Sequence, residues 1–425
     1  MQFLHNLGTR VGSVWDSLRE SLWFLPAIAL AVSVMVAEAA PALDDHLASP
    51  WWFSTDADSA RSLLSAIATA TLTLTGLVFS ITMLVLQLTS SQLSPRVMRR
   101  FLRDRNNQIV LALFISTFAY ALLALRNVET ESVPTFSVWL GFAMAMVSVG
   151  AFVRYIDHMA HAIRASSIIS GIGEETRETI DRLYPDPIEG DPDGHEQWPA
   201  GRPDREVAWA GGPGVLTNVS LDRIEEVAER CGARIAIVPM VGDFLPSGAP
   251  AFQAWGMLDE EATGELNETL VVGSERTMLR DAAFGLRQLV DIAERALSPG
   301  VNDPTTAVQA IDQLHDLLRR LAGRELAPEV RRDGDGRWRA LLRHPSWDDF
   351  VALGVDEVRL SGRTSLQTNR RLRFLLNDLM RVAPPERRNI LHTELALLDE
   401  SVEEAFAQPE DRRMAARPSA RGHGD

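Results

Sequence analysis

The residues with the clearest capacity for chemistry lie inside an uncharged stretch of 26 residues, 63–88. At about 1.5 Å per residue, a helix of this length crosses a hydrocarbon core of about 30 Å. Small, hydroxylated and amide side chains, together with one methionine, recur in it at steps of three and four, which places them on one stripe of the helix. Such a stripe either lines a wet path or packs closely against protein. Its members are Thr69, Thr73, Gly76, Ser80, Met83 and Gln87.

Other chemistries are excluded by the residues that the sequence lacks. All 42 basic side chains are arginine, so there is no lysine for a Schiff base, a P-loop or a biotin or lipoyl group. The single cysteine, Cys231, excludes a disulfide within the chain and a CxxC pair. The motifs of metalloproteases, α/β-hydrolases, P-loop proteins, dinucleotide-binding proteins and EF-hands do not occur. We therefore predict a protein that is not an enzyme and that holds no cofactor and no metal.

The hydropathy pattern predicts a mainly α membrane protein with four N-terminal transmembrane helices, embedded in a lipid bilayer. The first apolar segment ends in Ala37-Glu38-Ala39, a pattern typical of a signal-peptidase site. The charged residues ahead of that segment favour an uncleaved helix instead. Either outcome leaves the later topology unchanged. The predicted spans are 22–40, 63–88, 108–125 and 135–153.

The charges of the loops predict the orientation of the spans. The loop 41–61 carries four aspartates and one arginine, whereas the loop after the second span carries five arginines and one aspartate. Arginine-rich loops stay on the inner side, so both termini and the whole C-terminal half are predicted to be cytoplasmic. The arginine-rich loop after the second span suits a short amphipathic helix on the inner leaflet. This helix would act as a membrane anchor or as a gating or lipid-sensing collar. The arginines of this collar are Arg96, Arg99, Arg100, Arg103 and Arg105.

The second half of the chain differs sharply in charge and pattern. Residues 1–165 hold 11 arginines and 11 acidic residues, so the remainder carries the entire net charge of −15. An acidic half without a basic stripe argues against nucleic acid as a partner. Turn residues and apolar periodicity predict a cytoplasmic α+β module followed by a helical domain. The predicted divisions are a transmembrane four-helix region 1–164, a helical extension and linker 165–206, the α+β module 207–257, the helical domain 258–408 and a disordered tail 409–425.

The most distinctive part of the helical domain is a predicted helical hairpin over 281–322, joined by the sequence SPGVNDP. Asp303 suits the N-cap of the second helix, and Pro304 suits its first position. One interpretation of the loop is tight capping, with Arg287 holding backbone carbonyls or Asp291. The other is a polar pocket for a ligand or a neighbouring subunit. The residues of that pocket would be Arg287, Asn302, Asp303 and Thr305.

Three strings carry a resemblance to a known family. They are SLWFLPA, VFSITMLVLQLTSSQLSPRVMRRFLRDR and AFGLRQLVDIAERALSPGVNDPTTA. Together they resemble the predicted bacterial membrane proteins grouped as domain of unknown function 2254, over roughly residues 12–405. The resemblance implies a multi-span inner-membrane protein with a cytoplasmic C-terminal region, and it marks SPGVNDP as a hallmark. It implies no activity and assigns no functional residue.

Two functions agree with these features. The first is an oligomeric channel or pore-type protein, lined by the stripe and controlled by the cytoplasmic domain. Four spans enclose little of a pore alone, so this function requires a homo-oligomer. The second is a non-enzymatic membrane sensor or scaffold that binds a cytoplasmic protein or small ligand. The stripe also has a purely structural interpretation, as the seam along which the helices of one chain pack.

Overall fold

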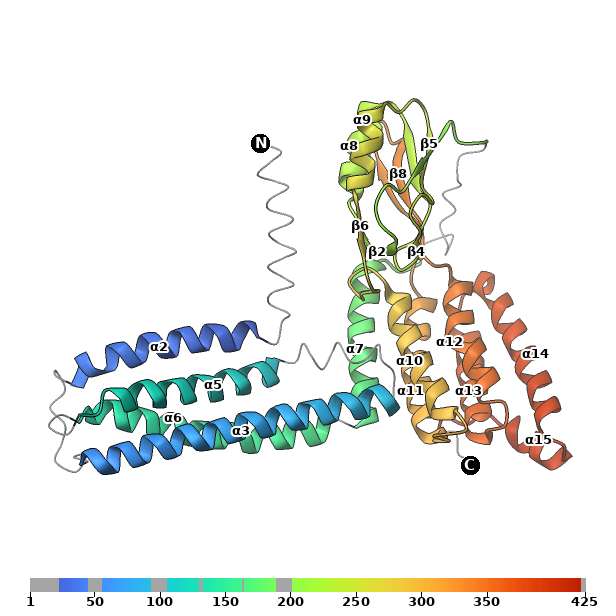
Figure 1. The fold of residues 1–425 in the computed structure, drawn as a ribbon. Helices are drawn as coiled ribbons and strands as arrows, with labels where there is room; N and C mark the ends of the chain where they lie inside the picture. Colours follow the sequence, from blue (N-terminus) through green and yellow to red (C-terminus); the bar gives the residue numbers. More distant parts are fainter. Residues whose placement is uncertain are drawn as a thin grey trace. The chain divides into compact units, whose positions relative to one another are not determined.

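A computed structural model describes most of the chain, and it is mostly helical with a small sheet region (Figure 1). The chain divides into two compact units, Met1–Ser167 and Ile168–Asp425, which are described separately below. The described residues are 23–44, 56–92, 105–129, 133–162, 164–188 and 201–421.

The first unit is built from apolar helices around a central one. Helix α5 packs against α2, α3 and α6, and it is the most buried of the long apolar helices. Among the described residues, three helices are long and apolar enough to cross a membrane, over Ala57–Gln87, Arg105–Arg126 and Thr135–His161, as the sequence predicts. The apolar part of α2, Phe24–Ala40, is shorter, so the fourth span remains a prediction. The helices of this unit are α2 (Phe24–Asp44), α3 (Ala57–Gln92), α5 (Arg105–Arg126) and α6 (Thr135–Ala162).

Polar side chains inside this unit are paired between helices. The hydroxyls of Thr82 on α3 and Tyr155 on α6 lie 2.7 Å apart, and those of Thr117 on α5 and Ser148 on α6 lie 3.1 Å apart. All four residues are buried. Since a bilayer offers no water to unpaired groups, such pairs hold the register of neighbouring helices.

The second unit contains a helical layer. Helix α7 packs against α10 and α11, α12 lies between α10 and α14, and α13 contacts α11 and α14. Ion pairs fasten α7 to α11, at 2.8 Å between Arg177 and Asp316 and 2.5 Å between Asp181 and Arg320. The helices are α7 (Ala165–Leu183), α10 (Ala282–Leu297), α11 (Pro304–Ala322), α12 (Trp347–Ser361), α13 (Leu366–Val382), the 3₁₀ turn η3 (Pro385–Arg387), α14 (Arg388–Ala405) and α15 (Pro409–Ala415).

Two small sheets and two helices form the rest of the described part of this unit (Figure 1). The first sheet has the order β1-β5-β3-β8-β7, with β3 and β8 parallel and the other pairs antiparallel. The second has the order β4-β2-β6 and is antiparallel. The elements are β1 (Arg205–Ala208), β2 (Gly214–Val219), α8 (Leu221–Arg230), β3 (Arg234–Ile237), β4 (Phe244–Leu245), β5 (Pro250–Trp255), α9 (Glu260–Glu268), β6 (Leu270–Gly273), β7 (Glu329–Arg332) and β8 (Trp338–Leu342).

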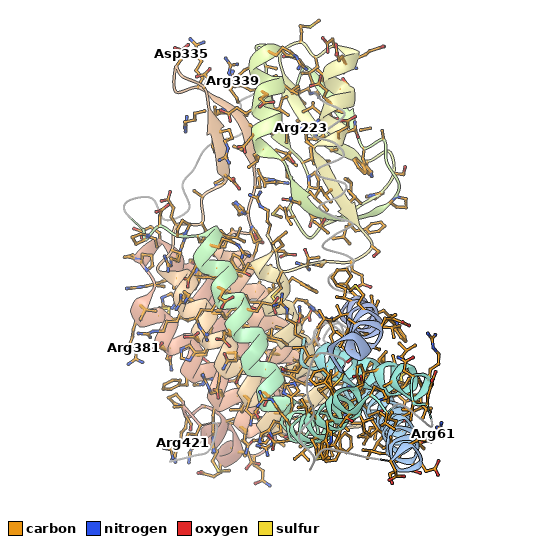
Figure 2. The ribbon with its side chains drawn as sticks, turned by 90° about the vertical axis from the view of Figure 1, so that its left-hand side faces the viewer. Arg61, Arg223, Asp335, Arg339, Arg381 and Arg421 are labelled. Carbon is orange, nitrogen blue, oxygen red and sulfur yellow. The ribbon has the colours of Figure 1, made fainter. Side chains whose placement is uncertain are left out.

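This sheet region corrects the predicted division at residue 257. Strands β6, β7 and β8 come from the segment 258–408 that was predicted to be helical, and they complete both sheets. The segment 331–337 contains the β7–β8 turn, with Gly336 at φ 79°. A turn of this kind is a hairpin signal for the β7–β8 pair, but the other partner of β8 is β3, which lies far away in the sequence. Figure 2 shows Asp335 at the tip of this hairpin, with Arg339 behind it.

The sheet region meets the helices at the start of α10. The Asp281 side chain caps α10 by accepting from the Phe284 N–H at 3.0 Å, and Arg276 donates to both of its carboxylate oxygens at 2.8 and 3.1 Å. Gly242 of the β3–β4 turn, at φ 99°, lies against this pair. A Cβ at that position would come within 2.3 Å of Asp281 Oδ2, so both its φ and its contact require glycine.

Two other boundaries differ from the predictions. The tail 409–425 was predicted to be disordered, but Pro409 begins α15 and Ala415 is fully buried. Backbone contacts hold this segment on α13, since Ser419 N–H donates to the Arg370 carbonyl at 3.2 Å. In addition, α7 does not simply extend the fourth span, because α6 ends at Ala162 and α7 begins at Ala165. The serines that follow favour a first helical turn over a helix interior.

Candidate functional site

The stripe on α3 lies on the exposed side of its helix. All six of its residues are exposed within the chain. The buried face contains Leu64, Ile67, Thr71, Val78, Thr82 and Val85. At about 100° per residue, the two sets lie on opposite sides of α3. The stripe therefore does not form the seam between the described helices of its own chain.

The hydroxyls of the stripe form hydrogen bonds within their own helix. Thr69, Thr73 and Ser80 each donate to the carbonyl four residues earlier, at 2.9 Å in each case. This bond uses the hydroxyl hydrogen, and the lone pairs of the oxygen remain as acceptors. Gly76 has nothing within 4 Å of the position of a Cβ, which leaves the α3 backbone open to close approach. The exposed face thus presents hydroxyl oxygens that can accept hydrogen bonds and, at Gly76, backbone that no side chain covers.

Only one residue of the predicted arginine collar can be placed. Arg105 is the first residue of α5 and is exposed. The other four, Arg96, Arg99, Arg100 and Arg103, lie outside the described residues, so the amphipathic helix remains a prediction.

The residues of the predicted cytoplasmic pocket belong to two separate places. Arg287 lies in the first half of α10 and binds Asp291 at 2.8 Å, Glu294 at 3.4 Å and Glu357 of α12 at 2.5 Å. The SPGVNDP loop follows the end of α10, about 16 Å further along the helix at 1.5 Å per residue. The expected pair with Asp291 is present, whereas Arg287 and the loop do not form one site.

The loop itself has the contacts of a helix cap. Asp303 accepts from Thr306 N–H at 3.1 Å and from the Thr306 hydroxyl at 2.6 Å. These hydrogen bonds, the hydroxyl one first, hold the pKa of Asp303 below its ordinary value. Asn302 adopts φ 49°, a left-handed conformation that asparagine tolerates, and its side chain is exposed. Thr305 is also exposed, at the first turn of α11. The contacts of this loop therefore match the capping interpretation.

A buried histidine network between α11 and α13 was not predicted. His315 Nδ1 lies 2.9 Å from Arg371, and its Nε2 lies 2.9 Å from Asp378. Because arginine cannot accept, Nδ1 is the acceptor and Nε2 carries the proton. Burial, and then the Arg371 charge, lower the pKa of His315, so the ring stays neutral. Arg371 also binds Asp312 at 2.6 Å, so the network joins the two helices.

Two carboxyl pairs on α12 were also not predicted. Asp356 and Glu394 of α14 share Arg359, and the next residue, Glu357, shares Arg287 with Glu294 of α10. Two consecutive acidic residues in a helix are common on solvated faces, so the sequence carries no signal for these contacts. Among the residues that the structure describes, no group of three or more histidine, cysteine or acidic side chains is placed to hold a metal ion.

Apolar helices that can cross a bilayer, joined to a separate unit rich in ion pairs, define an α-helical membrane protein. The family described as "Predicted membrane protein (DUF2254)" matches residues 19–378, and the chain belongs to this family. The chain is 32% identical over 424 residues to the uncharacterized proteins Rv1290c of Mycobacterium tuberculosis and Mb1321c of Mycobacterium bovis. These matches cover 96% of this chain and 81% of each relative. No solved structure matches the chain.

Proposed function

We propose that the chain is a non-enzymatic, homo-oligomeric channel or pore-type protein of the bacterial inner membrane, with both termini cytoplasmic. In this proposal copies associate through α3, and the stripe Thr69–Gln87 lines the path between them. The second unit is cytoplasmic and controls the path. The observation that carries the proposal is the exposure of all six stripe residues on the side of α3 opposite its buried face.

The packing of the first unit supports the need for several copies. Helix α5 contacts α2, α3 and α6, so a helix occupies the centre of the unit. A path along the stripe therefore requires α3 helices from different copies around a symmetry axis. The lone pairs of the stripe hydroxyls favour water or cations over anions along such a path.

The first test is flux through liposomes containing the purified chain. Gly76→Leu and Thr73→Leu place bulk on the stripe, and we expect each to reduce cation flux by roughly tenfold or more if the stripe is the narrowest part. Leu77→Phe is the matched control, because Leu77 is exposed on α3 but lies about 80° from the centre of the stripe. Impermeable liposomes containing folded wild-type protein would contradict the proposal.

The second test locates the contact between copies. Because Cys231 is the only cysteine, a Cys231→Ser background leaves no thiol. Adding Gly76→Cys should give disulfide-linked dimers in membranes, whereas adding Val78→Cys, which is buried on the opposite side of α3, should not. Equal cross-linking of the two variants would exclude α3 as the specific contact.

The sensor or scaffold function differs from this proposal in one observable. A sensor would leave liposomes impermeable while its second unit bound a cytoplasmic protein or small ligand. Since Arg287 is engaged by three carboxylates of its own chain, a ligand at this residue would have to displace one of them.

A further inference from the structure

Helix α12 is bounded on two sides by pairs of facing carboxyl groups. It packs between α10 and α14. Asp356 and Glu394 of α14 both lie within 4 Å of Arg359, and Glu357 and Glu294 of α10 both lie within 4 Å of Arg287. Like charges on two carboxyls that share one guanidinium repel each other, and this repulsion favours a proton on the more buried carboxyl of each pair.

In the α12–α14 pair one guanidinium serves two carboxyls, of which Glu394 is buried and Asp356 is 40% exposed. Its nearest cation, Arg359, lies 3.6 Å from Asp356 and 3.8 Å from Glu394, and it donates to Ser401 at 3.0 Å. Arg359 Nε and Glu394 Oε2 are both buried without a hydrogen-bond partner. Glu394 is only 3% exposed. Burial, followed by Asp356, raises the pKa of Glu394 to about 7.

The α10–α12 pair is similarly short of cations. Arg287 is its guanidinium, and it is shared among Asp291, Glu294 and Glu357. The Ser361 hydroxyl donates to Glu294 at 3.2 Å. Partial burial, followed by Glu357, raises the pKa of Glu294 above its ordinary value. One positive charge for three carboxyls favours retention of a proton here too.

Several charged groups on the other helices packed against α14 and α10 have partners of their own. Against α14, Arg373 of α13 binds Asp399 at 2.5 Å, Arg387 of η3 binds carbonyls at the end of α11, and Arg412 of α15 binds the Phe406 carbonyl at 2.6 Å. Against α10, Arg177 of α7 and Asp316 of α11 bind each other. Arg319 of α11 binds Asp378 of α13.

We propose that α10, α12 and α14 form a proton-operated clamp, in which a proton shared within each carboxyl pair holds α12 between its neighbours and loss of that proton loosens it. This clamp would make the packing of the second unit depend on cytoplasmic pH. The inference concerns the second unit alone and does not require that the chain form a pore.

The direction of the pH dependence follows from linkage. The folded chain keeps a proton on Glu394 up to a pH of about 7, whereas the unfolded chain loses it near the ordinary glutamate value. The folded state therefore binds more protons between these limits, and its stability falls as the pH rises through this window. The clamp is closed on the acidic side and open on the alkaline side.

The test is amide hydrogen exchange of the full chain in nanodiscs between pH 6 and pH 8, corrected for the intrinsic pH dependence of exchange. In the wild type, protection of α12 and α14 should fall by roughly tenfold as the pH rises, the equivalent of one unit of pKa shift. Glu394→Gln mimics the protonated carboxyl, so α12 and α14 should stay protected at pH 8. The matched control is Glu403→Gln, an exposed acid on the same helix, which should behave like the wild type.

A second variant guards against misfolding of the first. Asp356→Asn neutralises the other member of the α12–α14 pair and should also remove the pH dependence. Wild-type protection that does not change with pH would overturn the proposal. The same wild-type dependence in folded Glu394→Gln and Asp356→Asn would overturn it as well.

Discussion

The two units satisfy their polar groups in different ways. In the first, the exposed hydroxyls of α3 donate to carbonyls of the same helix, as Thr73 does to Thr69 at 2.9 Å. In the second, guanidinium groups bridge separate elements, as Arg177 of α7 does to Asp316 of α11 at 2.8 Å. In lipid, the polar atoms of a helix must be hydrogen-bonded within that helix or to another helix. Water-exposed helices can instead be joined by long charged side chains. The difference predicts which substitutions lower the free energy of unfolding and which leave it nearly unchanged.

The largest effect is expected at Arg387, the most buried arginine among the described residues. It is 1% exposed, donates to the Leu321 and Arg324 carbonyls at 3.0 and 2.9 Å, and stacks over Trp347 at 5.6 Å. Arg387→Met keeps an unbranched side chain but removes the guanidinium, which leaves the Leu321 and Arg324 carbonyls without these donors. We expect a loss of about 3 kcal/mol in the free energy of unfolding, measured by chemical denaturation.

Arg381→Met is the control for that change. Arg381 is 69% exposed, and its pair with Asp378 lies at the surface of the helical layer (Figure 2). Exposed pairs contribute about 0–1 kcal/mol, so this variant should unfold nearly as the wild type does. Equal losses of unfolding free energy in the two variants would show that the burial of an arginine does not determine how much it stabilises the fold.

The same contrast explains what could be predicted from the sequence. The cap at Asp303-Pro304 and the stripe on α3 depend on neighbouring residues and on helical period, and both are local patterns. The pairing of β8 with β3 and the facing of Asp356 and Glu394 depend on which distant segments meet. No local pattern carries that information, so the strands beyond residue 257 and the carboxyl pairs were missed. Segment α15 is different, because Pro409 and the residues after it do favour a helix start.

A smaller effect is expected where α7 meets α10. A Cβ on Gly285 would lie 2.0 Å from Thr176 Oγ1 and 2.8 Å from Thr176 Cβ, and Thr176 is fully buried. Gly285→Ala therefore forces the two helices apart, and we expect a loss of about 1–3 kcal/mol in the free energy of unfolding. Gly264→Ala on α9 meets nothing within 4 Å and should instead stabilise the chain by about 0.5–1 kcal/mol. Changes of opposite sign in the free energy of unfolding, measured by chemical denaturation, would confirm that α7 packs tightly against α10. Stabilisation by both variants would contradict it.

The smallest effects are expected within α3, where one substitution can be compared on its two faces. Thr82→Val removes the hydroxyl that lies 2.7 Å from Tyr155 and should cost about 0.6 kcal/mol, the average for such bonds in membranes. Thr73→Val removes only a bond to its own helix, on an exposed face, so in monomeric protein its effect should be close to zero. Unfolding by SDS in mixed micelles measures both. If Thr73→Val proves as costly as Thr82→Val only in preparations that contain oligomers, the added cost comes from contact between copies. The same loss in dilute monomer would mean that the hydroxyl is needed for α3 itself, and the argument for a shared path along the stripe would lose its basis.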